Sequence, residues 1–199
     1  MIKNPIQEVT NQLQYRAIGI VKGIYKPNII DQLNRGTIVD NEGNLLETVI
    51  LGKALALIKK YINLENNYFW IVYPRNKNIN NLHLQVAGIW DPYQLNKVDE
   101  SNSEKDPEEL LEELNLKNNY FSIRGELVYV NEQKKEVVVK ICSSPFSKRL
   151  KNATFKIIIE GEIPLELLNN FISLDVIRHG KTLRMVKYEI IEKIKSKKA

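Results

Sequence analysis

The stretch YFSIRGELVYVNEQKKEVVVKI, residues 120–141, contains two apolar runs separated by the polar turn 131–134. Within each run, apolar side chains fall on one face of an extended chain. They are Phe121, Ile123, Leu127 and Tyr129 in the first run and Val137, Val139 and Ile141 in the second. Successive side chains of a strand point to opposite faces, so this period of two indicates half-buried strands. The stretch therefore predicts an antiparallel hairpin with one face in a core.

The residues that follow continue the same pattern. Apolar alternation predicts three further strands, over 155–159, 172–176 and 183–191, and the last two are joined by the tight turn His179-Gly180-Lys181. Pro164 to Leu168 predicts a short helix between the third strand and the fourth. The second half of the chain therefore has three strands, a helix and two strands.

The first half has the same order. Strands are predicted within 15–25, 37–39, 45–51, 68–73 and 82–90, with a turn at 41–44. Between the third strand and the fourth, apolar residues recur with the spacing of one helical face: Leu51, Ala54, Leu55, Ile58, Tyr61 and Ile62. The chain therefore presents one order of elements twice.

This repeated order resembles the OB-fold superfamily, a five-stranded barrel whose helix lies between strands three and four. The resemblance is one of topology and covers residues 15–92 and 119–191. It implies a mainly β fold with short helices, as two tandem OB-like five-stranded barrels joined by an acidic linker and a short helix. A single mixed α/β domain with one large sheet is the alternative.

Four segments are expected from this interpretation. Residues 1–95 form the first OB-like domain, with an N-terminal helix beginning at Asn4-Pro5 and an insertion at 27–35. Residues 96–118 form an acidic linker and a short helix that begins at Asp106-Pro107. Residues 119–192 form the second domain, and residues 193–199 form a basic tail.

The composition fits a folded protein of the cell interior. Hydrophobic residues make up 43% of the 199 residues and the net charge is +5. No apolar run approaches a membrane span, and Met1 to Pro5 lacks a signal pattern. The lone Cys142 forms no internal disulfide, so we expect a reducing compartment, the cytoplasm or an organelle stroma.

The sequence gives little support for a catalytic function. The chain has no Walker or Rossmann glycine loop and no Gly-x-Ser-x-Gly elbow, and His83 and His179 fall in different halves. Cys142 is interpreted as a small buried hydrophobe, with a reactive thiol near Lys140 as the alternative. We expect no enzyme activity, no catalytic residue, no metal and no cofactor.

Nucleic-acid binding finds more support, because single strands are held by aromatic faces interleaved with cations. The segment 68–77 supplies Tyr68 and Trp70 as stacking candidates and Arg75 and Lys77 as phosphate contacts. The assignment of the rings assumes that the opposite face of this strand, with Phe69, fills the core. The alternative is that Trp70 itself is a core residue.

Two basic segments of the second half complete the candidate interface. The loop 143–151 offers Phe146, Lys148, Arg149 and Lys151, with a merely solvated loop as the alternative. The last hairpin offers Arg178, Lys181 and Arg184. Arg184 and Lys187 have opposite parity, so they face one groove only if the strand contains a bulge.

These features predict a non-enzymatic nucleic-acid-binding protein, with RNA favoured over single-stranded DNA. The alternative is a protein–protein adaptor or assembly subunit. In that case the partner surface consists of Trp90, Tyr93 and the stripe Leu110, Leu111 and Leu114.

Overall fold

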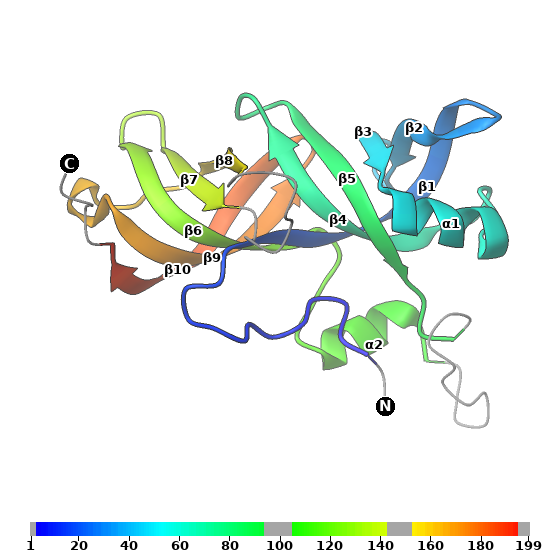
Figure 1. Ribbon diagram of the computed structural model, residues 1–199, viewed down its shortest axis with the longest axis horizontal. Coiled ribbons are helices and arrows are strands. Elements are labelled where there is room, and N and C mark those ends of the chain that lie inside the picture. Colours follow the sequence, from blue (N-terminus) through cyan, green and yellow to red (C-terminus); the bar gives the residue numbers. More distant parts are fainter. Residues whose placement is uncertain (1–2, 94–104, 143–152, 195–199) are drawn as a thin grey trace. The chain divides into compact units, whose positions relative to one another are not determined.

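A computed structural model describes residues 3–93, 105–142 and 153–194. The described chain packs as two compact units (Figure 1). Unit 1 comprises the described residues within 1–7, 19–73 and 83–120, and unit 2 those within 8–18, 74–82 and 121–199. The segments 8–18 and 74–82 therefore pack with the second half of the chain, although they belong to the first half of the sequence.

Unit 1 is built on five strands, β1 (Arg16–Ile29), β2 (Gln32–Val39), β3 (Leu45–Ile50), β4 (Tyr68–Asn76) and β5 (Leu82–Trp90). The first residues of β1, the last of β4 and Leu82 are grouped with unit 2. The strands are hydrogen-bonded in the order β2-β3-β5-β4-β1, and β1 also pairs with β2. This last pairing closes the sheet into a barrel, in which β3 and β5 run parallel.

Unit 2 repeats this arrangement with β6 (Tyr120–Asn131), β7 (Glu136–Cys142), β8 (Thr154–Glu160), β9 (Asn170–His179) and β10 (Thr182–Lys193). The order is β6-β7-β8-β10-β9, and β6 also pairs with β9. The seam between β8 and β10 is again parallel, with Arg184 opposite Glu160. The two units therefore share one strand connectivity, and the alternative of a single mixed α/β domain is wrong.

The helices lie where the sequence pattern predicts them. Helix α1 (Gly52–Tyr61) follows β3 and buries Ala54 and Ile58, and the 3₁₀ turn η1 (Leu165–Leu167) follows β8. Helix α2 (Pro107–Glu113) begins at Asp106, whose side chain accepts a hydrogen bond from the Glu108 amide. None of the described helices is long and apolar enough to cross a membrane.

The predicted N-terminal helix is wrong, because residues 3–15 form bends, turns and irregular chain. The Asn4 carboxamide accepts from the Ile6 amide at 2.9 Å, and Asn11 accepts from Leu13 at 2.8 Å. These short side-chain loops compete with the helical hydrogen bonds of the same amides. Tertiary contacts hold the segment, since Ile6 is buried and Lys3 accepts a hydrogen bond from the Trp90 indole.

Candidate nucleic-acid interface

The stacking role predicted for Tyr68 and Trp70 is wrong, because both rings lie inside the barrel of unit 1. Trp70 is 0% exposed and Tyr68 is 9% exposed. The Trp70 indole donates to the Gly23 carbonyl at 2.8 Å, and its ring contacts those of Tyr25 and Tyr68. A nucleotide base cannot reach a ring that is enclosed in this way.

The opposite face of β4 is also apolar, and other parts of unit 1 cover it. The Phe69 ring packs edge-on against the Trp90 ring at 5.7 Å between centroids, and the Lys22 ammonium lies over Phe69. The same ammonium pairs with Glu108 of α2 at 2.8 Å. The outer face of β4 is therefore buried at Phe69 and half-buried at Ile71 and Tyr73. Sequence alternation cannot tell the inner face from an outer face that is covered in this way.

The surface predicted to bind a protein partner is also largely internal. Trp90, Leu110 and Leu111 are buried in unit 1, and Leu114 is half-buried. The Tyr93 hydroxyl donates to the Lys105 carbonyl. These apolar groups hold the helix α2 segment and residues 3–6 in unit 1. The prediction that they form an exposed surface for a protein partner is therefore wrong.

The segment 74–82 brings the predicted cations Arg75 and Lys77 to the seam between β8 and β10 in unit 2. The Asn76 carboxamide donates to the Ile158 carbonyl at 2.7 Å and accepts from the Ile158 amide at 2.9 Å. The Arg75 guanidinium carbon lies 3.6 Å from the centre of the Phe155 ring. Thr182 donates its hydroxyl hydrogen to the Asn80 carboxamide oxygen at 2.8 Å. Arg75 is thus half-buried and holds the segment in place.

The seam presents exposed cations from two parts of the chain. Lys77 follows Asn76, Lys181 precedes Thr182, and both side chains are exposed. Arg184 is exposed and pairs with Glu160 at 2.7 Å. The structure therefore places the segment of Arg75 and Lys77 beside that of Lys181 and Arg184, and the Thr182–Asn80 hydrogen bond between the two segments joins residues 102 positions apart.

A bulge in β10 adds Lys187 to the same side. The register shifts between Met185 and Lys187, so Arg184 lies opposite Ile177 while Lys187 lies opposite Asp175. Positions 175 and 177 are two residues apart on β9 and share a face. The sequence required a bulge for Arg184 and Lys187 to share a face. The strand contains that bulge, and both residues lie on one face.

Arg178 does not belong to this surface. It is 3% exposed, and its guanidinium donates to the Gly180 carbonyl at 2.6 Å across the β9–β10 turn. The prediction that it contacts a nucleic acid is wrong, because the group is enclosed and holds the turn. The loop residues Phe146, Lys148, Arg149 and Lys151 lie outside the described residues.

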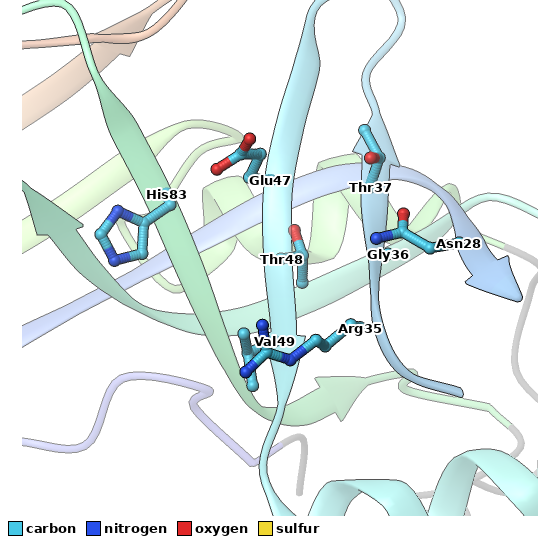
Figure 2. Close-up of a pocket in the computed structure, with 8 residues that line it drawn as sticks. All are labelled: Asn28, Arg35, Gly36, Thr37, Glu47, Thr48, Val49 and His83. Carbon is cyan, nitrogen blue, oxygen red and sulfur yellow. The ribbon is translucent and has the colours of Figure 1, made fainter. Parts of the chain in front are cut away.

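Unit 1 contains a second candidate surface, a hollow of about 290 Å³ on the outer side of its barrel. Figure 2 shows its lining on adjacent strands, with Glu47 and Val49 between Arg35 and His83. The lining is mainly polar and consists of Asn28, Arg35, Gly36, Thr37, Glu47, Thr48, Val49 and His83. At Gly36, one of the lining residues, β2 approaches β1 closely, since a Cβ atom would meet the Lys26 carbonyl oxygen at 2.3 Å.

Strand register arranges the outward side chains of this hollow in two rows. Lys26 pairs with Thr37 and Thr37 with Glu47, while the parallel pairing of Thr48 with Leu84 brings His83 level with Glu47. One step along the same face, Arg35 pairs with Val49 and Val49 with Gln85. A carboxylate, an imidazole, hydroxyls and cations are thus displayed on four adjacent strands.

Sequence reasoning missed this hollow. Arg35, Thr37, Glu47 and Val49 alternate with buried residues, which is the only sequence signal they carry. OB-folds commonly bind ligands on the surface of strands two and three, here β2 and β3. Applying that rule to the first barrel, and not only to the second, would have identified these residues.

A charged cluster in unit 2 is structural. Burial raises the pKa of Glu126, but the Lys140 ammonium and the Tyr15 hydroxyl outweigh burial and hold that pKa below its usual range. Burial, together with bonds to Glu126 and Cys142, raises the pKa of the Tyr15 phenol. Among the described residues, no group of three or more His, Cys, Asp and Glu side chains is placed to hold a metal.

Two family models match the chain. The first, PatR RNA-binding protein, N-terminal OB-fold domain, matches residues 17–97. The second, Cyanobacterial OB-fold-like RNA-binding domain, C-terminal, matches residues 123–192. No curated protein matches the chain.

The two matches occur in the order of the two barrels and confirm both the tandem fold and a nucleic-acid-binding function. The chain therefore belongs to the OB-fold superfamily, as a protein with two tandem OB-fold domains of the RNA-binding type.

Proposed function

We propose that the protein binds single-stranded RNA and catalyses no reaction on it. Each unit supplies a surface of its own: the hollow with its two rows in unit 1, and the β8–β10 seam in unit 2. The observation that carries the proposal is the exposed group of cations at the seam, Lys77, Lys181, Arg184 and Lys187, on a barrel that matches an RNA-binding domain.

Phosphate contacts dominate this mode of binding. The rings expected to stack are buried, whereas the lysines of the seam are exposed and suited to follow a phosphate backbone. Phe146, Lys148, Arg149 and Lys151 belong to the proposal as further contacts, because they lie in sequence between β7 and β8, and β8 is one strand of the seam.

A purely binding role is supported by the chemistry of the two surfaces. Among the described residues, the hollow contains one carboxylate and one imidazole, and the seam contains cations, amides and the ion pair of Arg184 with Glu160. Hydrolytic chemistry on RNA requires paired carboxylates or an activated nucleophile, and Glu47 is the one carboxylate among the described residues that line the hollow. The descriptions of the two matching family models also name binding and no reaction.

Fluorescence anisotropy with a labelled uridine-rich RNA tests this function, with the same sequence as DNA and as an RNA duplex for comparison. We expect single-stranded RNA to bind most tightly, with an affinity that falls as a power of the salt concentration. The double variant Lys77→Ala/Lys181→Ala should reduce that power by about 1.4, since each phosphate contact to a single strand contributes about 0.7.

Lys117→Ala is the matched control, because Lys117 is exposed in unit 1 after α2 and lies neither at the hollow nor at the seam. The triple variant Lys148→Ala/Arg149→Ala/Lys151→Ala tests the loop in the same way and should also flatten the salt dependence. Absence of binding to any single strand at low salt would contradict the function. An unchanged salt dependence in the double variant Lys77→Ala/Lys181→Ala would show that the seam does not contact the RNA.

A further inference from the structure

We propose that the hollow in unit 1 binds one guanine base, with the Glu47 carboxylate accepting hydrogen bonds from the guanine N1–H and N2–H groups. This inference rests on the RNA-binding function proposed above and adds a base preference to it. The juxtaposition that carries it is an exposed carboxylate between a hydroxyl and an imidazole, on a surface otherwise supplied with cations and amides.

Glu47 is unexpected on a surface that contacts a polyanion. Its side chain is exposed, and within the described part of the chain no ion pair or hydrogen bond neutralises it. An ionised carboxylate repels phosphate and accepts hydrogen bonds only. On this surface it therefore has one productive role, which is to receive the donor groups of a base.

Guanine fits that role better than the other three bases. Its N1–H and N2–H groups lie side by side on one edge and match the two oxygens of a carboxylate, as a bidentate pair requires. Adenine and cytosine place a ring-nitrogen acceptor beside their amino group, and this acceptor faces the second carboxylate oxygen. Uracil places its single N3–H between two carbonyl oxygens, which the carboxylate repels.

The other lining residues suit a single nucleotide. The volume of about 290 Å³ lies at the lower end of the range for small-molecule sites, so it accepts one base and not a stack of them. His83, level with Glu47, is the one ring of the lining, and bases stack on histidine as they do on other flat side chains.

A cation lies within reach of the phosphate of such a base. Arg35 is two residues from Thr37 along β2, a distance of about 7 Å, and Val49 beside it offers apolar contact. Figure 2 shows the guanidinium of Arg35 beside Val49, with Glu47 and His83 further along the neighbouring strands. The hollow therefore separates a carboxylate for the base edge from a cation for the phosphate.

Four labelled RNAs test the inference, each a uridine tract with one central guanosine, inosine, adenosine or cytidine. We expect the guanosine RNA to bind about tenfold more tightly than the adenosine and cytidine RNAs, the effect of one bidentate contact. Inosine keeps N1–H but lacks the N2 amino group, so its affinity should lie between those of guanosine and adenosine.

Glu47→Gln should lose most of this preference, because the amide keeps only one acceptor oxygen and can no longer accept from both N1–H and N2–H. The same variant should bind the plain uridine tract slightly more tightly, since a charge that repels phosphate is removed. Glu65→Gln is the matched control, because Glu65 is exposed in unit 1 and does not line the hollow. It should keep the full preference.

The two proposals fail in different ways. Equal affinities of the intact protein for all four RNAs, or a preference that is undiminished in Glu47→Gln, would overturn the guanine site while RNA binding stands. Failure of every RNA to bind, the uridine tract included, would overturn the proposed function and the guanine site with it.

Discussion

The Asn76 carboxamide holds both backbone groups of Ile158, donating to its carbonyl at 2.7 Å and accepting from its amide at 2.9 Å. A side chain thus makes the two hydrogen bonds that a neighbouring strand would make at this point of β8. Because Asn76 lies between Arg75 and Lys77, this pair of bonds also sets where the two cations lie at the seam.

Asn76→Ala should lower the free energy of unfolding by about 2–3 kcal/mol, because the two Ile158 backbone groups lose their partners in a partly buried site. Urea unfolding measures this loss. Asn81→Ala is the control, since Asn81 is exposed in the same segment and its side chain makes no hydrogen bond to another of the described residues. Equal stability of the two variants would show that the Asn76 bonds do not hold the segment.

Trp70→Phe should destabilise the protein and leave its RNA affinity unchanged. The substitution removes the indole bond to the Gly23 carbonyl and leaves a small cavity in the barrel, a loss of about 2–4 kcal/mol. Thermal unfolding and anisotropy on the folded variant measure the two quantities separately. A large loss of RNA affinity in a folded variant would instead restore the stacking role of this ring.

Gly36→Ala should unfold the edge of the hollow and weaken RNA binding. A Cβ atom at this position would lie 2.3 Å from the Lys26 carbonyl oxygen and 2.6 Å from the Tyr25 ring, so the β1–β2 pairing must open. Gly52→Ala is the matched control, because nothing lies within 4 Å of a Cβ atom there. Circular dichroism and RNA affinity should change in the first variant and stay constant in the second.

Acidification should remove a stabilising contribution of Glu126. Its pKa is below the usual value in the folded protein, despite burial, because Lys140 and Tyr15 bond to the carboxylate. Such a group stabilises the fold above the unfolded-state pKa, and the stabilisation disappears as the pH falls through the lower folded-state pKa. Glu126→Gln should therefore be less stable than the natural protein at pH 7, by about 1–2 kcal/mol.

The same difference should shrink as the pH is lowered below the unfolded-state pKa of about 4.3. Urea unfolding at a series of pH values measures it. Glu132→Gln supplies the comparison, because Glu132 is exposed in the β6–β7 turn. A difference between Glu126→Gln and the natural protein that is constant with pH would contradict the assigned ionisation.

The order of elements could be predicted from sequence because each strand carries its own signal. Apolar residues of period two, as in Val137, Val139 and Ile141, interrupted by turn residues such as Gly180, suffice to place strands. The repetition of that order then led to two barrels. The prediction of an N-terminal helix is wrong because local hydrogen bonds of the Asn4 and Asn11 side chains favour turns.

Site residues were harder to predict, because their position depends on contacts between distant segments. Of the cations predicted from charge, Lys77, Lys181 and Arg184 are exposed, whereas Arg178 is enclosed. The predicted stacking ring of Trp70 is enclosed as well. The bulge beside Val186, which brings Arg184 and Lys187 to one face, is a property of strand pairing. Charge alone does not reveal such differences.

The amino-acid sequence by itself determined the strands, their order and the repetition of that order, since alternation and turn chemistry act over a few residues. Only the tertiary structure decided which face of β4 is inside, because the Trp90 ring covers Phe69 on the other face with an equally apolar group. It also decided that Asn76 bonds to Ile158, 82 residues away, and that Glu47 and His83 lie level on adjacent strands. Burial and pairing between distant segments are properties of the assembled barrel, and no local pattern encodes them.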